Sequence, residues 1–98
     1  MLYCYAVFDD KTSSYQNPFF SVSDGAAVRI FTSGIRAQGT VLNEYPSDFK
    51  LYKVGEFDEL SGLTQPASDS GNPVFIVDGS ACIVKVSDKF SPISEIKE

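Results

Sequence analysis

Near the start of the chain, seven consecutive residues, 2–8, are all apolar or aromatic. In a strand, successive side chains point to opposite faces, so this run would place apolar groups on both sides of a sheet. A strand of this kind is typical of the middle of a sheet rather than its edge. One face would carry Leu2, Cys4, Ala6 and Phe8, and the other Tyr3, Tyr5 and Val7.

One main helix is predicted over about residues 24–33. Ser23 is a suitable N-cap, because its hydroxyl can accept a free backbone N–H of the first turn. Gly34 fits the position after the helix, where a left-handed residue often ends it. The stripe expected to pack on the sheet consists of Ala27, Ile30 and Phe31. The following residues 39–45 fit either a single helical turn or an extended segment.

A second long strand is predicted over residues 49–57. Alternation would put Leu51, Lys53, Gly55 and Phe57 on one face, and Tyr52, Val54 and Glu56 on the other. Gly55 inside a strand indicates a bulge or a close backbone approach. Residues 58–62 then fit a hairpin loop with glycine at a left-handed position, before a short return strand near residues 63–65.

Asp78-Gly79 lies between two apolar runs, 74–77 and 81–86, which is a strong hairpin signal through a type I′ turn. These elements together predict an α+β fold. It would have a small, mainly antiparallel sheet of about 4–5 strands, with the helix on one face. Residues 1–87 would form the single domain, with a mobile loop at about 65–72, and residues 88–98 a C-terminal tail.

The chain is acidic, with 8 basic against 13 acidic residues and a net charge of −5. Proteins that bind nucleic acid regardless of sequence are usually basic, so that class is disfavoured. No signal peptide or membrane span is recognised, and we expect no membrane contact and action in a reducing cytoplasm. Cys4 and Cys82 are interpreted as free thiols, with a disulfide between them as the open alternative.

Catalysis is not expected, because the chain has no histidine, no phosphate-binding glycine loop and no evident nucleophile with a base. We therefore predict a protein that is not an enzyme and uses no cofactor or metal. Two acidic clusters, Asp9-Asp10 and Glu56-Asp58-Glu59, are interpreted as solvated turns. They would form a weak divalent-cation site only if their strand ends were adjacent.

The candidate interaction surface is aromatic. Tyr3, Tyr5 and Tyr52 would share one sheet face if their strands are neighbours. Such rings form a protein core, a protein interface or a platform that stacks unpaired bases, and all three interpretations stay open. The basic residues placed to assist a phosphate are Arg29, Lys50 and Lys53.

Several segments, in this order and spacing, resemble one family. They are Tyr5-Ala6-Val7-Phe8-Asp9 with Lys11, Tyr15, Pro18-Phe19-Phe20, Asp24-Gly25-Ala26-Ala27-Val28-Arg29, and the run from Pro46 to Asp58 with Gly62. The chain is similar here to the small nonstructural protein of gokushovirus-like Microviridae, which are single-stranded DNA phages. The resemblance implies a phage protein made in the host bacterial cytoplasm and accessory to single-stranded DNA synthesis. It supplies no catalytic residues.

Two functions are compatible with these observations. The first is an adaptor that binds a phage or host replication or assembly protein during single-stranded DNA synthesis and packaging. The second is a module that binds single-stranded DNA through the sheet tyrosines. A homodimer is compatible with either, because the apolar strand edge near residue 78 would be available to a second copy.

Overall fold

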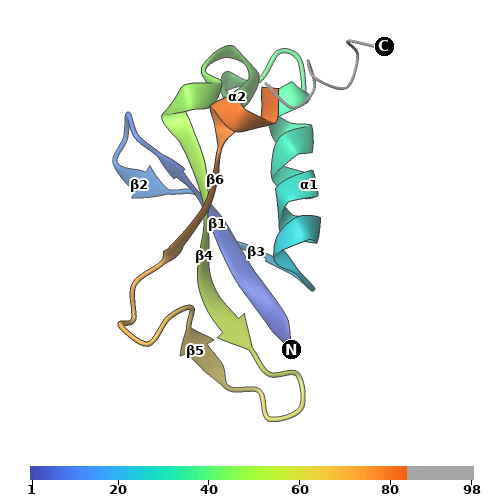
Figure 1. The fold of residues 1–98 in the computed structure, drawn as a ribbon, viewed down its shortest axis with the longest axis vertical. Helices are drawn as coiled ribbons and strands as arrows, with labels where there is room; N and C mark the ends of the chain where they lie inside the picture. Colours follow the sequence, from blue (N-terminus) through green and yellow to red (C-terminus); the bar gives the residue numbers. More distant parts are fainter. Residues whose placement is uncertain (84–98) are drawn as a thin grey trace, which may run out of the picture.

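The computed structural model describes residues 1–83, and its centre is a pair of long strands (Figure 1). Strand β1, Leu2–Asp9, lies antiparallel to β4, Phe49–Phe57. Their register runs from Leu2 opposite Phe57 to Asp9 opposite Phe49. The central position predicted for residues 2–8 is confirmed, because β1 has partners on both sides.

Each edge of the sheet is divided between two short strands. β2, Ser14–Tyr15, and β3, Phe19–Ser21, pair with opposite ends of β1. β5, Thr64–Pro66, and β6, Val74–Asp78, do the same along β4. All of these pairs are antiparallel, so the α+β prediction is confirmed. The sheet reaches six strands because neither edge is one continuous strand.

Helix α1, Asp24–Arg36, covers one face of this sheet, which we call the helix face. The predicted cap is confirmed, since the Ser23 side chain accepts a hydrogen bond from the Ala26 backbone N–H at 3.1 Å. The predicted end at Gly34 is wrong. Gly34 lies inside the helix, where a Cβ would stand 3.4 Å from Leu42 Cδ2, and the helix ends instead at Arg36. The side chains of Thr40 and Asn43 then donate to the last carbonyls of α1.

The core lies between α1 and the sheet. Its buried side chains are Tyr5, Val7, Ala27, Phe31, Ile35, Phe49, Leu51 and Cys82. The predicted helix stripe is wrong at Ile30, whose side chain is 51% exposed. Because α1 continues to Arg36, its buried row follows an i, i+4, i+8 pattern and includes Ile35 instead.

Two short helical turns connect α1 to β4. In residues 39–45 the helical alternative is correct: α2, Val41–Glu44, begins after Thr40, whose side chain accepts from the Asn43 backbone N–H. The 3-10 turn η1, Pro46–Asp48, follows directly. Its proline stands at the start of the turn, where the missing N–H costs no hydrogen bond.

The predicted hairpin at Asp78-Gly79 is wrong. β6 ends at Asp78 and residues 79–83 are helical. The Asp78 carboxylate accepts from the Ser80 backbone N–H at 2.9 Å and so caps this helix. Gly79 is needed because a Cβ there would stand 2.1 Å from the Pro46 carbonyl oxygen. The dipeptide thus begins a helix against η1, which brings Cys82 into the core.

A bulge in β4 changes which side chains share a face. Cys4 pairs with Gly55 and Tyr5 with Lys53, so Val54 has no partner across the strand pair. Gly55 was expected to mark a bulge or a close backbone approach. The bulge lies at Val54, next to it, and the close approach is at Gly55 itself, where a Cβ would lie 3.0 Å from the Gln65 carbonyl oxygen. The predicted alternation along 49–57 is wrong beyond Lys53, because Gly55 and Phe57 move to the face that carries Tyr52.

The hairpin after β4 agrees with the prediction for residues 58–65. Gly62 has a positive φ of 77°, and the Asp58 backbone N–H donates to the Leu63 carbonyl. β5 occupies part of the segment expected as a loop at 65–72, and residues 67–73 link it to β6. The expected tail, 88–98, lies outside the described residues. In the described part, no helix is long and apolar enough to cross a membrane.

Candidate functional site

The face of the sheet opposite α1 gathers aromatic and apolar side chains. Residues paired across an antiparallel ladder share a face, so this set follows from the register. It consists of Leu2, Phe8, Tyr15, Phe20, Tyr52, Phe57 and Phe75, and we call it the open face. Tyr15, Phe20 and Phe75 are 44%, 53% and 52% exposed, although each is a large hydrophobic residue.

Tyr52 stands at the centre of one half of the open face. Its ring centroid lies 6.2 Å from that of Phe8, 5.7 Å from Tyr15 and 5.7 Å from Phe75, each in edge-to-face geometry. Phe8 and Tyr15 are also in contact, with centroids 4.9 Å apart. Edge-to-face pairs of this kind stabilise one another beyond the burial of their area. The four rings therefore form one ordered aromatic ridge.

The other half of the open face is hollow. Leu2, Phe20 and Phe57 line a depression of about 240 Å³. Phe20 and Phe57 meet edge to face, with centroids 6.2 Å apart. Phe57 belongs here only because of the bulge at Val54, since unbroken alternation would turn its ring toward the helix face.

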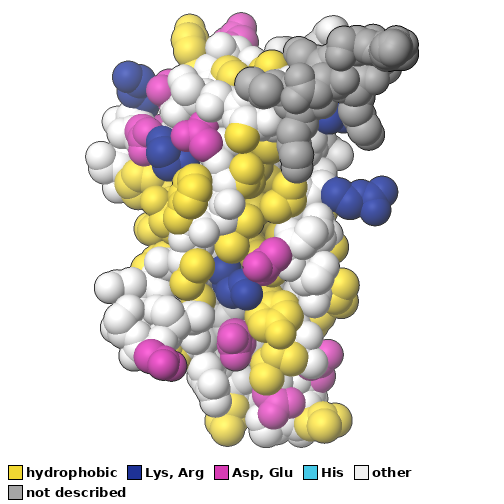
Figure 2. All heavy atoms as spheres, in the orientation of Figure 1, with side chains coloured by type: hydrophobic (Ala, Val, Ile, Leu, Met, Phe, Trp, Pro, Cys, Tyr) yellow, Lys and Arg dark blue, Asp and Glu magenta, His cyan; other side chains and the backbone are white. Residues whose placement is uncertain are grey.

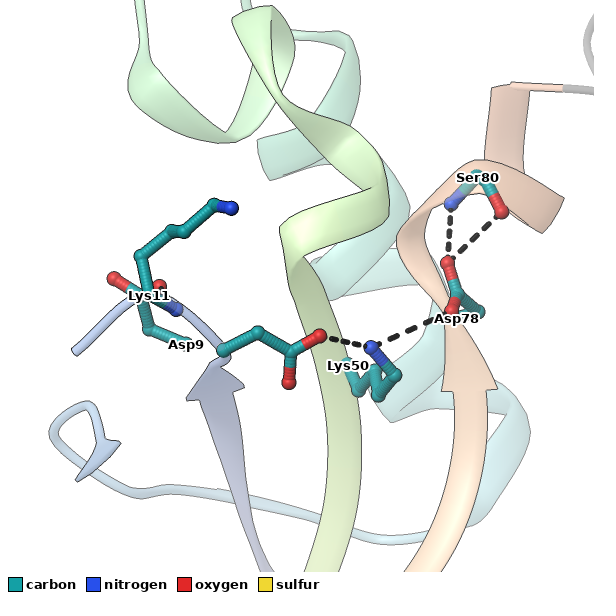
Figure 3. Close-up of polar contacts among 6 residues, drawn as sticks. Asp9, Lys11, Lys50, Asp78 and Ser80 are labelled. Atoms are coloured by element: carbon teal, nitrogen blue, oxygen red, sulfur yellow. Dashed lines mark hydrogen bonds and ion pairs between the residues drawn. The ribbon is translucent and has the colours of Figure 1, made fainter. Parts of the chain in front are cut away.

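The positive charge of Lys50, beside the open face, is compensated within the protein. Figure 3 shows the Lys50 amine between carboxylates from the ends of β1 and β6. It lies 2.5 Å from Asp10 Oδ2 and 3.7 Å from Asp78 Oδ2. The hydrogen bond with Asp10 raises the pKa of Lys50 above its usual value. No contact joins Lys11 to this group in the same view.

The three predicted tyrosines do not share a face, so that expectation is wrong. Their strands are neighbours, but Tyr52 pairs with Ala6 and therefore points away from Tyr3 and Tyr5. Tyr5 is fully buried under α1, where its hydroxyl donates to Asp24 Oδ1. Burial, and then this hydrogen bond, raises the pKa of Tyr5 well above its ordinary value.

The predicted basic residues are also dispersed. Lys53 lies on the helix face, 3.1 Å from Asp24 Oδ1 and 4.5 Å from the centre of the Tyr3 ring. Arg29 is exposed on α1, and Lys50 alone reaches the open face. In Figure 2, basic side chains in the middle and at the upper left of the view lie next to acidic ones. The structure therefore gives no continuous basic groove over the described residues.

Most of the open face was missed from the sequence. Phe20 and Phe75 enter it through pairing with Cys4 and Tyr52, and Tyr15 enters through pairing with Phe8. One local signal existed, because Phe19 and Phe20 are adjacent and must point to opposite faces of an extended strand. Phe19 packs against the core and Phe20 is exposed.

The two acidic clusters lie at opposite ends of the sheet. Asp9 pairs with Phe49, at the start of β4, whereas Glu56 pairs with Tyr3, at the start of β1. The adjacency required for a shared cation site is therefore absent. No group of three or more potential metal ligands comes together within residues 1–83. Cys4 and Cys82 are both free thiols, and burial raises the pKa of Cys4.

A second depression, of about 480 Å³, lies at the end of the sheet beside α2. Val41, Tyr45 and Phe49 form its apolar lining, and Asp9, Lys11 and Asp48 add charged groups. The Asp9 carboxylate is already engaged, since it accepts the Lys11 backbone N–H at 2.9 Å. This hollow is separate from the open face because Asp9 and Phe49 belong to the helix face of their strands.

Comparisons with known proteins place the chain in a family. No curated protein and no solved structure matches it. The model of a family described as "Phage ORF5 protein" matches residues 2–82, which is most of the chain and includes the whole open face. The chain therefore belongs to the Phage ORF5 protein family.

Proposed function

We propose that this phage accessory protein acts by binding another protein through its open face. The family supports a phage accessory protein. The observation that carries the finer proposal is the gathering of seven apolar side chains on a sheet face that no described element covers. The partner would be a phage or host replication or assembly protein. The phage accessory protein would act in the host bacterial cytoplasm during single-stranded DNA synthesis and packaging, as the resemblance to Microviridae implies.

The composition of the open face supports a protein partner. Large exposed apolar patches mark interaction sites, and aromatic rings contribute strongly to protein interfaces because they bury much area at little entropic cost. The exposed rings Tyr15, Phe20 and Phe75 come from three different strands. A patch assembled by the tertiary fold is present only in the folded protein.

Binding without catalysis is part of this proposal. The chain has no histidine. The pKa of buried Tyr5 is raised, and its hydroxyl donates a hydrogen bond to Asp24. Lys50 and Lys53 form ion pairs with carboxylates. These polar groups serve contacts within the fold, which supports a role through surface recognition.

Binding of single-stranded DNA is the second candidate. It is favoured by the exposed rings Tyr15 and Phe75, because rings on an open sheet face can stack unpaired bases. It is opposed because, within residues 1–83, no uncompensated cation lies beside these rings. Lys50 already holds two carboxylates, and phosphates are normally bound by free Lys and Arg.

Co-purification from infected cells, with and without nuclease, separates the two candidates. We expect the tagged protein to retain a phage or host protein after nuclease treatment. Phe20→Ser and Phe75→Ser should lose it, whereas Ile30→Ser should retain it, because Ile30 is equally exposed but lies on α1. Loss of every protein partner on nuclease treatment, with tight oligonucleotide binding at low salt, would favour DNA binding instead.

A further inference from the structure

We propose that the open face receives an amphipathic helix of the partner, with an apolar stripe flanked by lysine or arginine. This inference rests on the proposed function and specifies the chemistry of the partner. Three features of the described residues carry it: the relief of the open face, the way the same sheet already binds α1, and the sign of the charge beside the aromatic ridge.

The surface of the open face is uneven along β4, with a raised part, a gap and a hollow that could receive spaced side chains of a partner. Along β4, the ring of Tyr52 and the ring of Phe57 stand on either side of Gly55, which has no side chain. The aromatic ridge around Tyr52 rises on one side of this gap, and the hollow of Leu2, Phe20 and Phe57 opens on the other. A partner with spaced apolar side chains can place one in the hollow and others against the ridge.

The helix face shows that this sheet can pack against an amphipathic helix. There α1 inserts Ala27, Phe31 and Ile35, one residue per helical turn, between side chains of β1 and β4. Both central strands carry apolar groups on their two faces, and a sheet of that kind is stably covered by helices on each side. A partner strand would instead pair at an edge and leave the open face exposed.

The charge selects a basic partner. The described part of the chain contains five basic residues. Arg29 and Arg36 lie on α1, Lys53 on the helix face, and Lys11 beside the second hollow. Lys50, the remaining one, stands beside the aromatic ridge between Asp10 and Asp78, which leaves a surplus carboxylate there. A second copy would add carboxylates and DNA would add phosphates, whereas lysine or arginine would complement them.

Synthetic helices test this inference directly. The probe is a labelled peptide of about 18 residues, roughly five turns, with leucine along one face and lysine elsewhere. Two controls are a leucine–glutamate peptide with the same pattern and a leucine–lysine peptide with its order scrambled. By fluorescence anisotropy with the full chain, we expect the patterned leucine–lysine peptide to bind about tenfold more tightly than either control.

Variants of the protein locate the binding. Phe20→Ser and Phe75→Ser should each lower the affinity for the leucine–lysine peptide about fivefold or more, and Ile30→Ser should leave this affinity unchanged. The double variant Asp10→Asn, Asp78→Asn should weaken it about threefold at low salt and by less at high salt, because only the charge is removed. Asn at position 78 preserves the cap on Ser80.

Several results would overturn the inference. The first is equal affinity for the lysine and glutamate peptides, and the second is equal weakening by Ile30→Ser and Phe75→Ser. The third is concentration-dependent dimerisation that Phe75→Ser abolishes and that excludes the peptide, which would make a second copy the occupant. If co-purification of a partner depends on the open face while no helix peptide binds, the proposed function stands and this inference alone fails. Co-purification insensitive to Phe20→Ser and Phe75→Ser would contradict the proposed function itself.

Discussion

The hydroxyl of Tyr5 donates a 2.5 Å hydrogen bond to Oδ1 of Asp24, and so connects the middle of the sheet to the first turn of α1. The ring of Tyr5 is fully buried, whereas Asp24 is about half exposed. Lys53 reaches the same carboxylate oxygen from β4 at 3.1 Å. One carboxylate therefore joins both central strands to the helix that covers them.

Removing this hydroxyl should weaken the fold. We expect Tyr5→Phe to lower the free energy of unfolding by about 1.5–3 kcal/mol, the range for hydrogen bonds to charged groups. Urea denaturation followed by circular dichroism measures the change. Tyr45→Phe is the matched control, because Tyr45 is 57% exposed and a surface change of this kind alters stability by less than about 0.5 kcal/mol. Equal effects of the two variants would contradict the role given to Tyr5.

The same pair makes stability depend on acid. The hydrogen bond from Tyr5, and then Lys53, holds the pKa of Asp24 below its ordinary 3.8 in the folded protein. The unfolded chain therefore takes up the proton first, and the stabilisation is present above about pH 4 and lost as the pH falls through the folded pKa. We expect Asp24→Asn to flatten the acid limb of the stability–pH curve.

Two variants make this acid dependence specific. Ile30→Ser should keep the acid limb of the unmodified protein, because Ile30 has no part in the Tyr5–Asp24 pair. Tyr5→Phe should flatten it partly, since it removes the largest cause of the lowered pKa of Asp24. A full acid limb in Asp24→Asn would show that other carboxylates account for it, such as Asp58 and Glu59, whose pKa values are also lowered.

Much of the fold follows from short-range patterns. The apolar run 2–8 indicated a central strand, Ser23 indicated the start of α1, and Gly62 indicated a left-handed turn residue. Each of these depends on the conformational preferences of a few neighbouring residues. The end of α1 was harder to predict from neighbouring residues, because the carbonyls at its end accept hydrogen bonds from Thr40 and Asn43 in the next segment.

The open face depends on contacts between distant residues. The set of side chains on this face differs from the one predicted because of the bulge at Val54. The bulge inverts the alternation beyond it and brings Phe57 beside Phe20. The bulge accompanies the close approach of the Gln65 carbonyl to Gly55, a contact that residues 49–57 do not encode alone. Asp78-Gly79 shows the same limit. The dipeptide suits a tight turn, but the carbonyl of Pro46 lies where any larger residue would stand.

Gly79 provides a test of that packing. We expect Gly79→Ala to lower the free energy of unfolding by about 3 kcal/mol, because its Cβ would stand 2.1 Å from the Pro46 oxygen and 2.9 Å from Ile35 Cδ1. Gly25→Ala is the matched control in the first turn of α1, where the nearest side-chain atom is 4.0 Å away. It should raise stability by about 0.5 kcal/mol through helix propensity. A neutral Gly79→Ala would contradict the close approach to η1.

Substituting an exposed ring of the open face should leave the protein folded. Phe75 is 52% exposed, whereas Phe49 is buried in the core beneath α1. We therefore expect Phe75→Ser to cost about 1 kcal/mol, mainly through its contact with Tyr52, and Phe49→Ser to cost more than about 3 kcal/mol. Urea denaturation compares them, and binding of a hydrophobic dye should fall in folded Phe75→Ser but not in Ile30→Ser. If Phe75→Ser were as damaging as Phe49→Ser, the ridge would be part of the core, and its loss of partner binding would reflect unfolding instead of a lost contact.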